Sequence, residues 1–374
     1  MKKVLTITCH QVYNYGATLQ QYALLEVLKE LGYDAKTINY NPPYLSNHFK
    51  LWAVPNTYQK NLFLKLAYIS LKLPRRILSL KRKKSFDTFE NKYLSILPKN
   101  YSSNEELKDD LPLADFYICG SDQIWNSFFQ NGKDPAFYLD FVPDSKLKIS
   151  YAASFAIERV EEDLKPFVES MARRINHISV RETSALNILN DLGISNAIQV
   201  LDPVFLISRD YWISTFTNKI PEKYIFIYDF DSNKQIEKIA SKEAVKFGFK
   251  IYTVNKNIKY AHKNFNNEGP DKFLSLLNNA EFILTNSFHA VCFSLIFNKK
   301  FVVVNRTEKI NTRMKDLTEL AGVPELLLKP DDYRGIDDVN IDYSKVNIML
   351  NNQIENSRTF LINALQENDT FTTN

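Results

Sequence analysis

The chain has 374 residues, of which 45% are hydrophobic and 24% charged, the composition of an ordinary globular protein that is too long for a single core. Its nine glycines form neither GxGxxG nor GxxxxGK[ST], and its three cysteines lack a CxxC pair, which argues against a glycine-rich phosphate loop, a zinc site and a disulfide framework. The formal net charge of +4 is unevenly spread, because residues 35–86 hold eleven lysines and arginines and no acidic residue.

The first 40 residues are predicted to form a βαβ unit. Residues 3–9 read as a strand, residues 17–32 as a helix with its leucines on one face, and residues 35–40 as a second strand. The apolar part of the first strand is too short for a signal peptide or a transmembrane helix, so we expect a cytoplasmic protein.

Residues 46–110 interrupt this alternation, and we predict a basic helical insertion there. The α/β pattern then resumes, with strands expected at 114–122, 148–155, 177–182 and 197–205 and helices near 162–175 and 183–192. A second series follows, with strands expected at 223–230, 250–255, 281–286 and 300–305 and helices at 233–247, 270–279, 290–297 and 312–322. This order predicts an α/β protein with two Rossmann-like domains facing a central cleft, at 1–210 and 211–344, and a C-terminal helix and polar tail at 345–374.

Ligands of open α/β sheets bind beyond the carboxyl ends of the strands, so polar residues at predicted strand ends are candidate site residues. After the first strand, Asn14, Tyr15 and Gly16 lead into a helix whose first N–H groups could bind an anion, although such turns are also common as purely structural features. After the strand at 114–122 come Gly120, Ser121, Asp122 and Gln123, which suit a hydroxyl-rich ligand or, alternatively, a helix cap.

Three further clusters follow strands. Arg181 could hold a phosphate or carboxylate through its planar guanidinium, or form a surface ion pair. Asp202, before Pro203, is interpreted mainly as a structural residue. Asn286, Ser287 and His289 are expected at a strand-to-helix turn that points into the cleft, where a histidine can donate or accept a proton.

In this order, the segments NYGAxLQxYAL, GSDQIWN, YAASF, SVRE, LDPVF and TNSFHAVxFS resemble the polysaccharide pyruvyl transferase family over roughly residues 3–322. The resemblance implies a two-domain fold similar to that of the GT-B glycosyltransferases. It also implies transfer of a pyruvyl group from phosphoenolpyruvate to sugar hydroxyls, which forms a pyruvate ketal on a surface polysaccharide (an exopolysaccharide, for example) or on its lipid-linked precursor.

The same resemblance implies roles for individual residues. Arg181 and His289 match the family's strand-end arginine and its histidine, but some members carry Arg-Leu-His where this chain has Ser287-Phe288-His289. Arg306 and Arg313 are candidate substitutes for that missing arginine. No cofactor is expected, because phosphoenolpyruvate is the donor substrate, and no metal, because the His and carboxylate residues show no ligand spacing.

We expect His289 to act as general acid or base, and Arg181 with Arg313 to neutralise donor charge. Asp122, Gln123 and Asn14 would orient the acceptor, and Asp122 is also a candidate for a second base.

Two alternatives stay open. The first is a GT-B-type glycosyltransferase that uses a nucleotide sugar, for which residues 228–231 (YDFD) offer a weak ribose-reading acid. The second is a catalytically silent, glycan-binding member of the family, an interpretation that the missing arginine favours and that His289 and Arg181 argue against.

The basic segment also suggests a partner. Residues 50–84 interleave bases with Leu, Ile and Phe, so they could contact an anionic membrane at the inner face of the cell membrane, or form a solvated helix without a partner. No nucleic-acid recognition module accompanies the charge.

Overall fold

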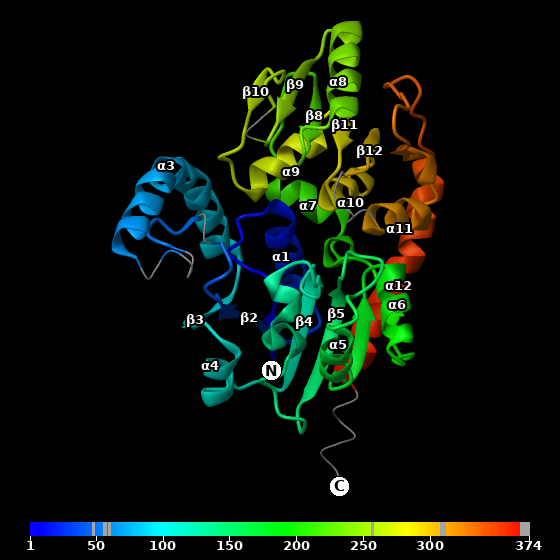
Figure 1. Cartoon of the computed structure of the whole chain (residues 1–374). Helices are drawn as coiled ribbons and strands as arrows, with labels where there is room; N and C mark the ends of the chain where they lie inside the picture. Colours follow the sequence, from blue (N-terminus) through cyan, green and yellow to red (C-terminus); the bar gives the residue numbers. More distant parts are fainter. Residues whose placement is uncertain (47–48, 55–57, 59–60, 256–257, 307–311, 367–374) are drawn as a thin grey trace.

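The fold consists of two parallel β-sheets flanked by helices (Figure 1). The computed structural model describes residues 1–46, 49–54, 58, 61–255, 258–306 and 312–366. The strands of the first sheet are β1 Lys3–Ile7, β2 Asp34–Tyr40, β3 Ile96–Tyr101, β4 Phe116–Asp122, β5 Leu147–Ala153, β6 His177–Val180 and β7 Ile198–Gln199. Those of the second are β8 Tyr224–Tyr228, β9 Lys250–Thr253, β10 Lys263–Asn264, β11 Phe282–Thr285, β12 Phe301–Val304 and β13 Leu327–Leu328.

Both sheets have the strand order of a Rossmann-like domain. The first runs β3-β2-β1-β4-β5-β6-β7 and the second β10-β9-β8-β11-β12-β13, and every pairing is parallel. The order reverses between β1 and β4 in one sheet and between β8 and β11 in the other, which is where such sheets bind ligands. The predicted fold class, two parallel α/β domains, is confirmed.

The helices are α1 Tyr15–Glu30, α3 Leu62–Tyr93, α4 Asn104–Asp109, α5 Lys165–Ala172, α6 Thr183–Asp191, α7 Arg209–Phe216, α8 Lys234–Phe247, α9 Pro270–Asn279, α10 Phe288–Ile296, α11 Thr312–Leu320 and α12 Tyr343–Gln366. None of these helices combines the length and apolar character that crossing a bilayer requires.

Helix α1 packs between the two domains. Its Tyr15 ring stacks on Phe273 of α9 with centroids 4.5 Å apart, and its Tyr22 lies 5.7 Å from Trp212 of α7. These residues belong to one apolar cluster that also contains the core of the second sheet. The domains therefore share a continuous hydrophobic contact, and this contact fixes the positions of the loops that approach it.

Three sequence expectations need correction. The predicted helical insertion at 46–110 contains β3, which pairs with β2 at the edge of the first sheet. The strand expected at 197–205 ends after Gln199, because Asp202 caps a short 3₁₀ helix that starts at Pro203. The helix expected from residue 290 begins at Phe288, so that His289 lies in its first turn.

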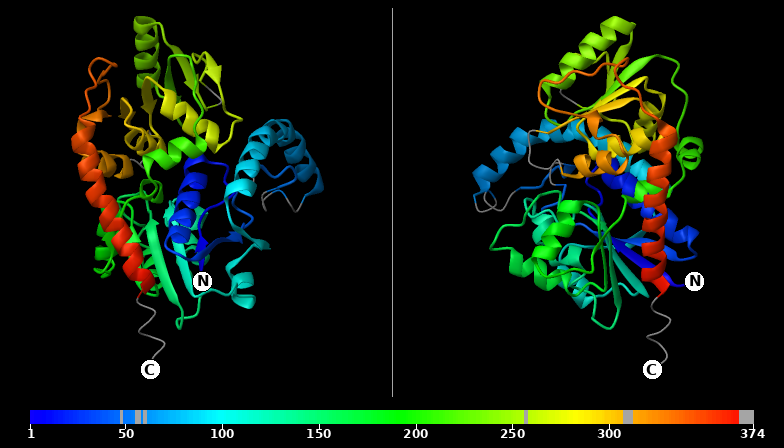
Figure 2. Two further views of the ribbon diagram at one scale, coloured as in Figure 1. Left: turned by 180° about the vertical axis from the view of Figure 1, so that it is seen from behind. Right: turned by 90° about the vertical axis from the view of Figure 1, so that its right-hand side faces the viewer.

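The C-terminal helix connects the two domains (Figure 2). At its start, the Tyr343 hydroxyl donates to the backbone carbonyl groups of Ser294 and Lys299 in the second domain. Near its end, the Ser357 hydroxyl accepts a hydrogen bond from the Leu201 N–H, and Arg358 donates to the Leu206 carbonyl. This helix, predicted as a separate C-terminal element, therefore returns the chain to the N-terminal domain.

Candidate active site

A cavity of about 330 Å³ lies where the ligand-binding ends of the two sheets meet. Asn14, in the loop after β1, and Asp122, at the end of β4, come from the switch point of the first sheet. Asn286, after β11, comes from the switch point of the second. The other lining residues are Gln123, Phe129, Phe230, Ser287, Phe288, His289, Arg306, Arg313 and Met314. Both sheets thus contribute their expected ligand-binding edge to one cavity.

A buried network of charged and titratable side chains lies behind the cavity wall. Arg181 Nη1 lies 2.5 Å from Asp202 Oδ2, and Arg181 Nη2 lies 3.1 Å from Asp122 Oδ1. His289 Nε2 lies 3.4 Å from the same Asp202 oxygen. The side chains of Arg181 and Asp202 are 1% and 0% exposed. Removing Asp202 would leave Arg181 with Asp122 alone, and removing Arg181 would leave two carboxylates without its guanidinium; breaking a buried pair in this way is strongly destabilising.

The cations around the two carboxyl groups keep both of them ionised. Burial acts to raise the pKa of Asp202, but His289 and Arg181 outweigh it and hold this pKa below the usual value. Burial also acts to raise the pKa of Asp122. Arg181, His289 and Arg313 outweigh it, so the pKa of Asp122 lies below its usual value. At neutral pH the network therefore contains two carboxylates.

Arg313 is a buried cation at the cavity wall. Its Nη1 atom lies 3.6 Å from Asp122 Oδ1, and its Cζ atom lies 5.2 Å from the centre of the Phe288 ring. Burial, and then the charge of Arg181, lower the pKa of Arg313 to about 10, so it is still protonated at neutral pH. A second cation, Arg306, stacks 4.1 Å from the Phe230 ring.

The imidazole of His289 packs against the first turn of α1, where residue 16 is glycine. A Cβ atom at Gly16 would lie 1.9 Å from His289 Nδ1, far inside van der Waals contact. Asn14 caps the same helix, because its Oδ1 accepts hydrogen bonds from the N–H groups of Gly16 and Ala17. The segment NYGA therefore starts a helix and also leaves room for a histidine from the other domain.

Ser287 has a structural role at the start of α10. Its hydroxyl accepts a hydrogen bond from the Ala290 N–H, and its own N–H donates to Thr285 Oγ1. A serine suits this capping position, and the cap fixes the turn from which His289 projects.

The comparison with known families decides the relationship. The family model described as polysaccharide pyruvyl transferase matches residues 14–308, which include both sheets' switch points. The chain belongs to this family. No curated protein sequence matches it.

Several solved structures resemble this family member in fold. A UDP-GlcNAc 2-epimerase from Neisseria meningitidis has 13% identity and a TM-score of 0.46, with 98% of this chain and 100% of that chain covered. A putative UDP-N-acetylglucosamine 2-epimerase from Listeria monocytogenes has 11% identity and a TM-score of 0.48, with coverage of 97% and 91%. The E. coli heptosyltransferase WaaC has 11% identity and a TM-score of 0.38, with coverage of 83% and 90%.

Most residues singled out from the pyruvyl transferase motifs line the cavity. They are Asn14, Asp122, Gln123, Asn286, Ser287, His289, Arg306 and Arg313. Arg181, predicted to be catalytic, does not line it, because both its terminal nitrogens face carboxylates behind the wall.

Four other predicted substrate-binding residues also lie off the cavity. Tyr15 is packed between the domains, and its hydroxyl donates to the Glu268 carbonyl. Gly16 contacts His289 instead. Gly120 packs on β5, where a Cβ atom would meet the Tyr151 carbonyl oxygen at 2.1 Å, and Ser121 is buried with its hydroxyl donating to the Ala152 carbonyl.

Three residues of the family motifs have site roles that the sequence analysis did not assign. Asp202 of LDPVF joins Arg181 to His289, beyond its cap on the 3₁₀ helix. Glu182 of SVRE accepts hydrogen bonds from the N–H groups of Phe155 and Ala156 and so holds the loop after β5. Gln20 of NYGAxLQ accepts from the Ser121 N–H. The sequence signal for these roles was that all three residues lie within motifs of the family resemblance.

The acidic residues of the segment 228–231, the weak candidates for binding a ribose, already accept hydrogen bonds from neighbouring protein groups. Asp229 accepts hydrogen bonds from the N–H groups of Asp231 and Asn233, and Asn286 donates to both carboxylates. Within the described ranges, no group of three or more His, Cys, Asp or Glu side chains is arranged to hold a metal ion.

Proposed function

We propose that the protein transfers a pyruvyl group from phosphoenolpyruvate to two hydroxyl groups of a sugar in a polysaccharide or its lipid-linked precursor, forming a cyclic ketal. The observation that carries this proposal is the cavity in which His289 and Asp122 meet the guanidinium groups of Arg306 and Arg313. Phosphoenolpyruvate acts as the donor substrate, and the proposed reaction uses no cofactor or metal.

The two arginines fit the charges of the donor. Phosphoenolpyruvate carries a phosphate and a carboxylate, and planar guanidinium groups bind such oxyanions bidentately. Arg313 of α11 lies beside Asp122 in the wall, and Arg306 follows β12 of the same C-terminal domain. These cations take the place of the arginine that some family members carry at the position of Ser287, which here caps α10.

His289 is the proposed proton donor to the enol methylene of the donor. Protonation makes C2 an oxocarbenium-like centre; one sugar hydroxyl adds to it, the C2–O bond to phosphate breaks, and the second hydroxyl closes the ketal. Of the two hydroxyl protons, one replaces the proton given to the methyl group and the other leaves with phosphate. Asp122, kept ionised by its cations, is the proposed base for an attacking hydroxyl. Arg181 is a positioning residue, since it holds Asp122 and Asp202 from behind.

The test measures phosphate release from phosphoenolpyruvate in the presence of sugar acceptors. We expect His289→Ala to lower kcat by 100-fold or more, in line with loss of a general acid. Arg313→Ala should mainly raise the KM for phosphoenolpyruvate. Arg159→Ala, which removes an exposed guanidinium elsewhere, should change neither value.

Unchanged phosphate release in His289→Ala would refute the assignment. A thermal shift with UDP- or GDP-sugars and none with phosphoenolpyruvate would favour the nucleotide-sugar transferase instead. Acceptor binding without any turnover would favour the catalytically silent alternative.

We also propose that α3 rests on an anionic membrane surface at the inner face of the cell membrane, where lipid-linked acceptors would be found. Figures 1 and 2 show α3 standing out from the two sheets as an arm. The arm exposes large apolar side chains, for example Phe63 at 78% and Leu71 at 75%. The others in α3 are Leu62, Leu64, Leu66, Ile77 and Leu78, and Trp52, in the segment before α3, is exposed as well. Exposed apolar residues interleaved with bases, and without acids, suit an anionic bilayer surface.

Co-sedimentation with phosphatidylglycerol vesicles tests this contact. We expect binding that weakens with salt, disappears with phosphatidylcholine, and falls in Phe63→Ser/Leu71→Ser. The matched control is Val245→Ser/Ile348→Ser, which removes equally exposed apolar residues from other helices. The unmodified protein could instead dimerise in the absence of lipid. If Phe63→Ser/Leu71→Ser abolished that dimer, the arm would be identified as a self-association surface.

A further inference from the structure

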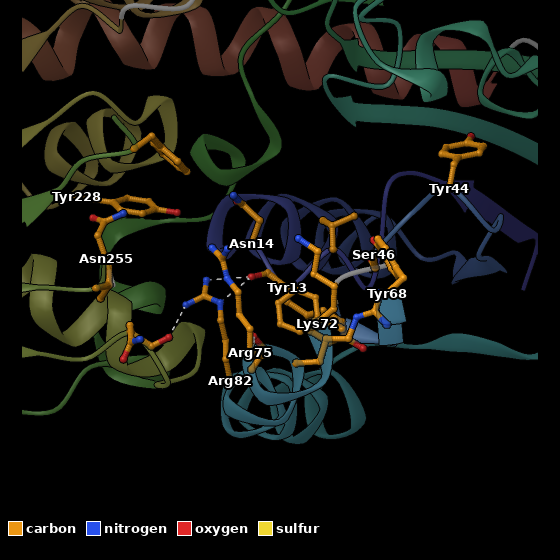
Figure 3. Close-up of a pocket in the computed structure, with 17 residues that line it drawn as sticks. Tyr13, Asn14, Tyr44, Ser46, Tyr68, Lys72, Arg75, Arg82, Tyr228 and Asn255 are labelled. Atoms are coloured by element: carbon orange, nitrogen blue, oxygen red, sulfur yellow. Dashed lines mark hydrogen bonds between the residues drawn. The ribbon is translucent and has the colours of Figure 1, made fainter. Parts of the chain in front are cut away.

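A second, larger cavity of about 710 Å³ lies between α3 and the C-terminal domain (Figure 3). Its walls come from the loop after β1, from α3 and from the strand ends of the second sheet. Two of its lining residues, Asn14 and Phe230, also line the first cavity. The two cavities therefore adjoin, and a ligand that extends from one can reach the other.

The walls of this second cavity are cationic. Four of the lining residues are basic (Lys72, Arg75, Arg76 and Arg82), and none of the described lining residues is acidic. This follows from the sequence, because α3 lies largely within the acid-free stretch 35–86. A site of this kind has an uncompensated positive potential and attracts anionic ligands.

Two of these four cations are already used to build the walls. Arg82 donates to the carbonyl groups of Tyr13 and Asn266, and Arg76 donates to those of Leu51 and Ala53. These bonds fix α3 against the neighbouring loops. The cavity is therefore held open by its own structure.

The other two cations have no such task. Among the residues that the structure describes, the side chains of Lys72 and Arg75 have neither a hydrogen bond nor an ion pair, and the Lys72 ammonium lies over the Tyr68 ring, at 5.9 Å. Figure 3 shows Lys72 between Tyr13 and Tyr68, and Arg75 on the other side of Tyr13, next to Arg82. Two unpaired donors next to flat aromatic walls suit a ligand that carries both an anionic group and an apolar ring face.

We propose that this cavity is the acceptor site and that it selects an anionic saccharide, one whose phosphate or carboxylate group lies between Lys72 and Arg75. Its role as acceptor site rests on the proposed function. The sugar rings would extend along the tyrosines toward Asn14 and Phe230, so that the reacting hydroxyls reach Asp122 and His289 in the first cavity. A neutral acceptor would leave both cations without a partner.

The test is a binding experiment that needs no turnover. The probes are N-acetylglucosamine 1-phosphate, glucuronic acid and uncharged N-acetylglucosamine, titrated at about 0.15 M salt, where weak surface attraction is screened. Lys72→Gln/Arg75→Gln removes the two free cations. Lys81→Gln/Lys84→Gln removes the same charge from exposed positions of the same helix. Phosphoenolpyruvate is titrated in parallel into all three proteins.

We expect at least one anionic sugar to bind the unmodified protein tenfold or more tightly than the uncharged one. That preference should vanish in Lys72→Gln/Arg75→Gln, persist in the control, and leave phosphoenolpyruvate binding unchanged. Tight binding of the phosphate probe alone, or of the glucuronic acid alone, identifies which anion the acceptor carries.

Equal affinity for charged and uncharged sugars would overturn the proposal. So would loss of phosphoenolpyruvate binding in Lys72→Gln/Arg75→Gln with sugar binding retained, because it would make this cavity the donor site. Failure of the unmodified protein to release phosphate, with the anion preference intact, would contradict the proposed reaction and leave the anion site standing.

Discussion

At the scale of single residues, His289 depends on the absence of a side chain at residue 16. The two residues are 273 positions apart in the sequence, yet a Cβ atom at Gly16 would overlap the imidazole. Gly16 lies in the first turn of a helix and does not take a left-handed conformation there. Glycine is therefore needed at this position because it lacks a side chain, not because of its backbone freedom.

This contact predicts the effect of Gly16→Ala. The new methyl group should displace the imidazole and lower kcat about 100-fold, since misplacement of a catalytic group by about 1 Å can cost that much. Alanine is a better helix former than glycine by about 1 kcal/mol, which offsets part of the stability that the overlap with the buried imidazole costs. The double variant Gly16→Ala/His289→Ala should be no less active than His289→Ala alone; a further loss would mean that Gly16 acts on something other than the histidine.

Asp202 is the residue on which the buried charge network converges. Its pKa is lowered in the folded protein, so its ionised form stabilises the fold above the unfolded-state pKa of about 3.9. That contribution is lost as the pH falls through the lower, folded-state pKa.

Asp202→Asn should lower the free energy of unfolding by about 3 kcal/mol at pH 7, because it removes one partner of a buried ion pair. The difference from the unmodified protein should shrink as the pH falls below about 4, because Asp202 of the unfolded chain then takes up a proton that the folded protein, with its lowered pKa, does not yet bind. Urea denaturation at pH 7, 5 and 3 measures it. Asp163→Asn, at an exposed position, is the control, and an equal loss of stability there would contradict a specific role for the network.

At the scale of secondary structure, α12 joins the domains through side chains on several of its turns. Leu361 is fully buried in this helix, whereas Ile348 in the same helix is 63% exposed. The helix was expected from the sequence, but its packing partners are far away in the chain, which a local pattern does not specify.

Leu361→Ala should therefore lower the free energy of unfolding by about 3 kcal/mol, as large-to-small changes in a core do. Ile348→Ala should change it by less than about 0.5 kcal/mol. Chemical denaturation of both variants compares the two sites. Equal, small effects would show that α12 contributes little to joining the domains.

At the scale of the whole molecule, Arg82 joins α3, the loop after β1 and the C-terminal domain. Its guanidinium donates to the Tyr13 carbonyl, to the Tyr15 hydroxyl and to the Asn266 carbonyl, and its Cζ lies 4.4 Å from the Tyr15 ring. A single planar fork thus connects three parts of the chain, all of which border the second cavity or the domain contact.

Arg82→Lys should lower the free energy of unfolding by about 2 kcal/mol, because an ammonium group cannot reproduce the fork and its several hydrogen bonds. Arg75→Lys changes a side chain of the same helix that has no bonded partner among the described residues, and it should be neutral for stability. Thermal unfolding of the two variants separates these outcomes. Equal melting temperatures would indicate that the fork is replaceable.

Much of the fold followed from local patterns. Strand-length apolar runs alternating with amphipathic helices predict two parallel α/β domains, and the polar residues after strands predict His289 and Asp122 at a ligand edge. Arg313 was a candidate only through the family resemblance, as a substitute for the arginine missing at Ser287. The pattern failed for β3, which carries few apolar residues at the sheet edge, and for 197–205, where Pro203 begins a 3₁₀ helix.

The sequence by itself determined the repeated strand–helix order, the positions of polar residues at strand ends and the basic, acid-free stretch 35–86, because each of these depends on residues close together in the chain. Only the tertiary structure decided that Arg181 lies behind the wall with Asp202, that Gly16 makes room for His289, and that Lys72 and Arg75 line a cavity in which no described residue pairs with their side chains. Each of these depends on contacts between distant segments, and such contacts are fixed by the packing of the two domains through α1 and α12.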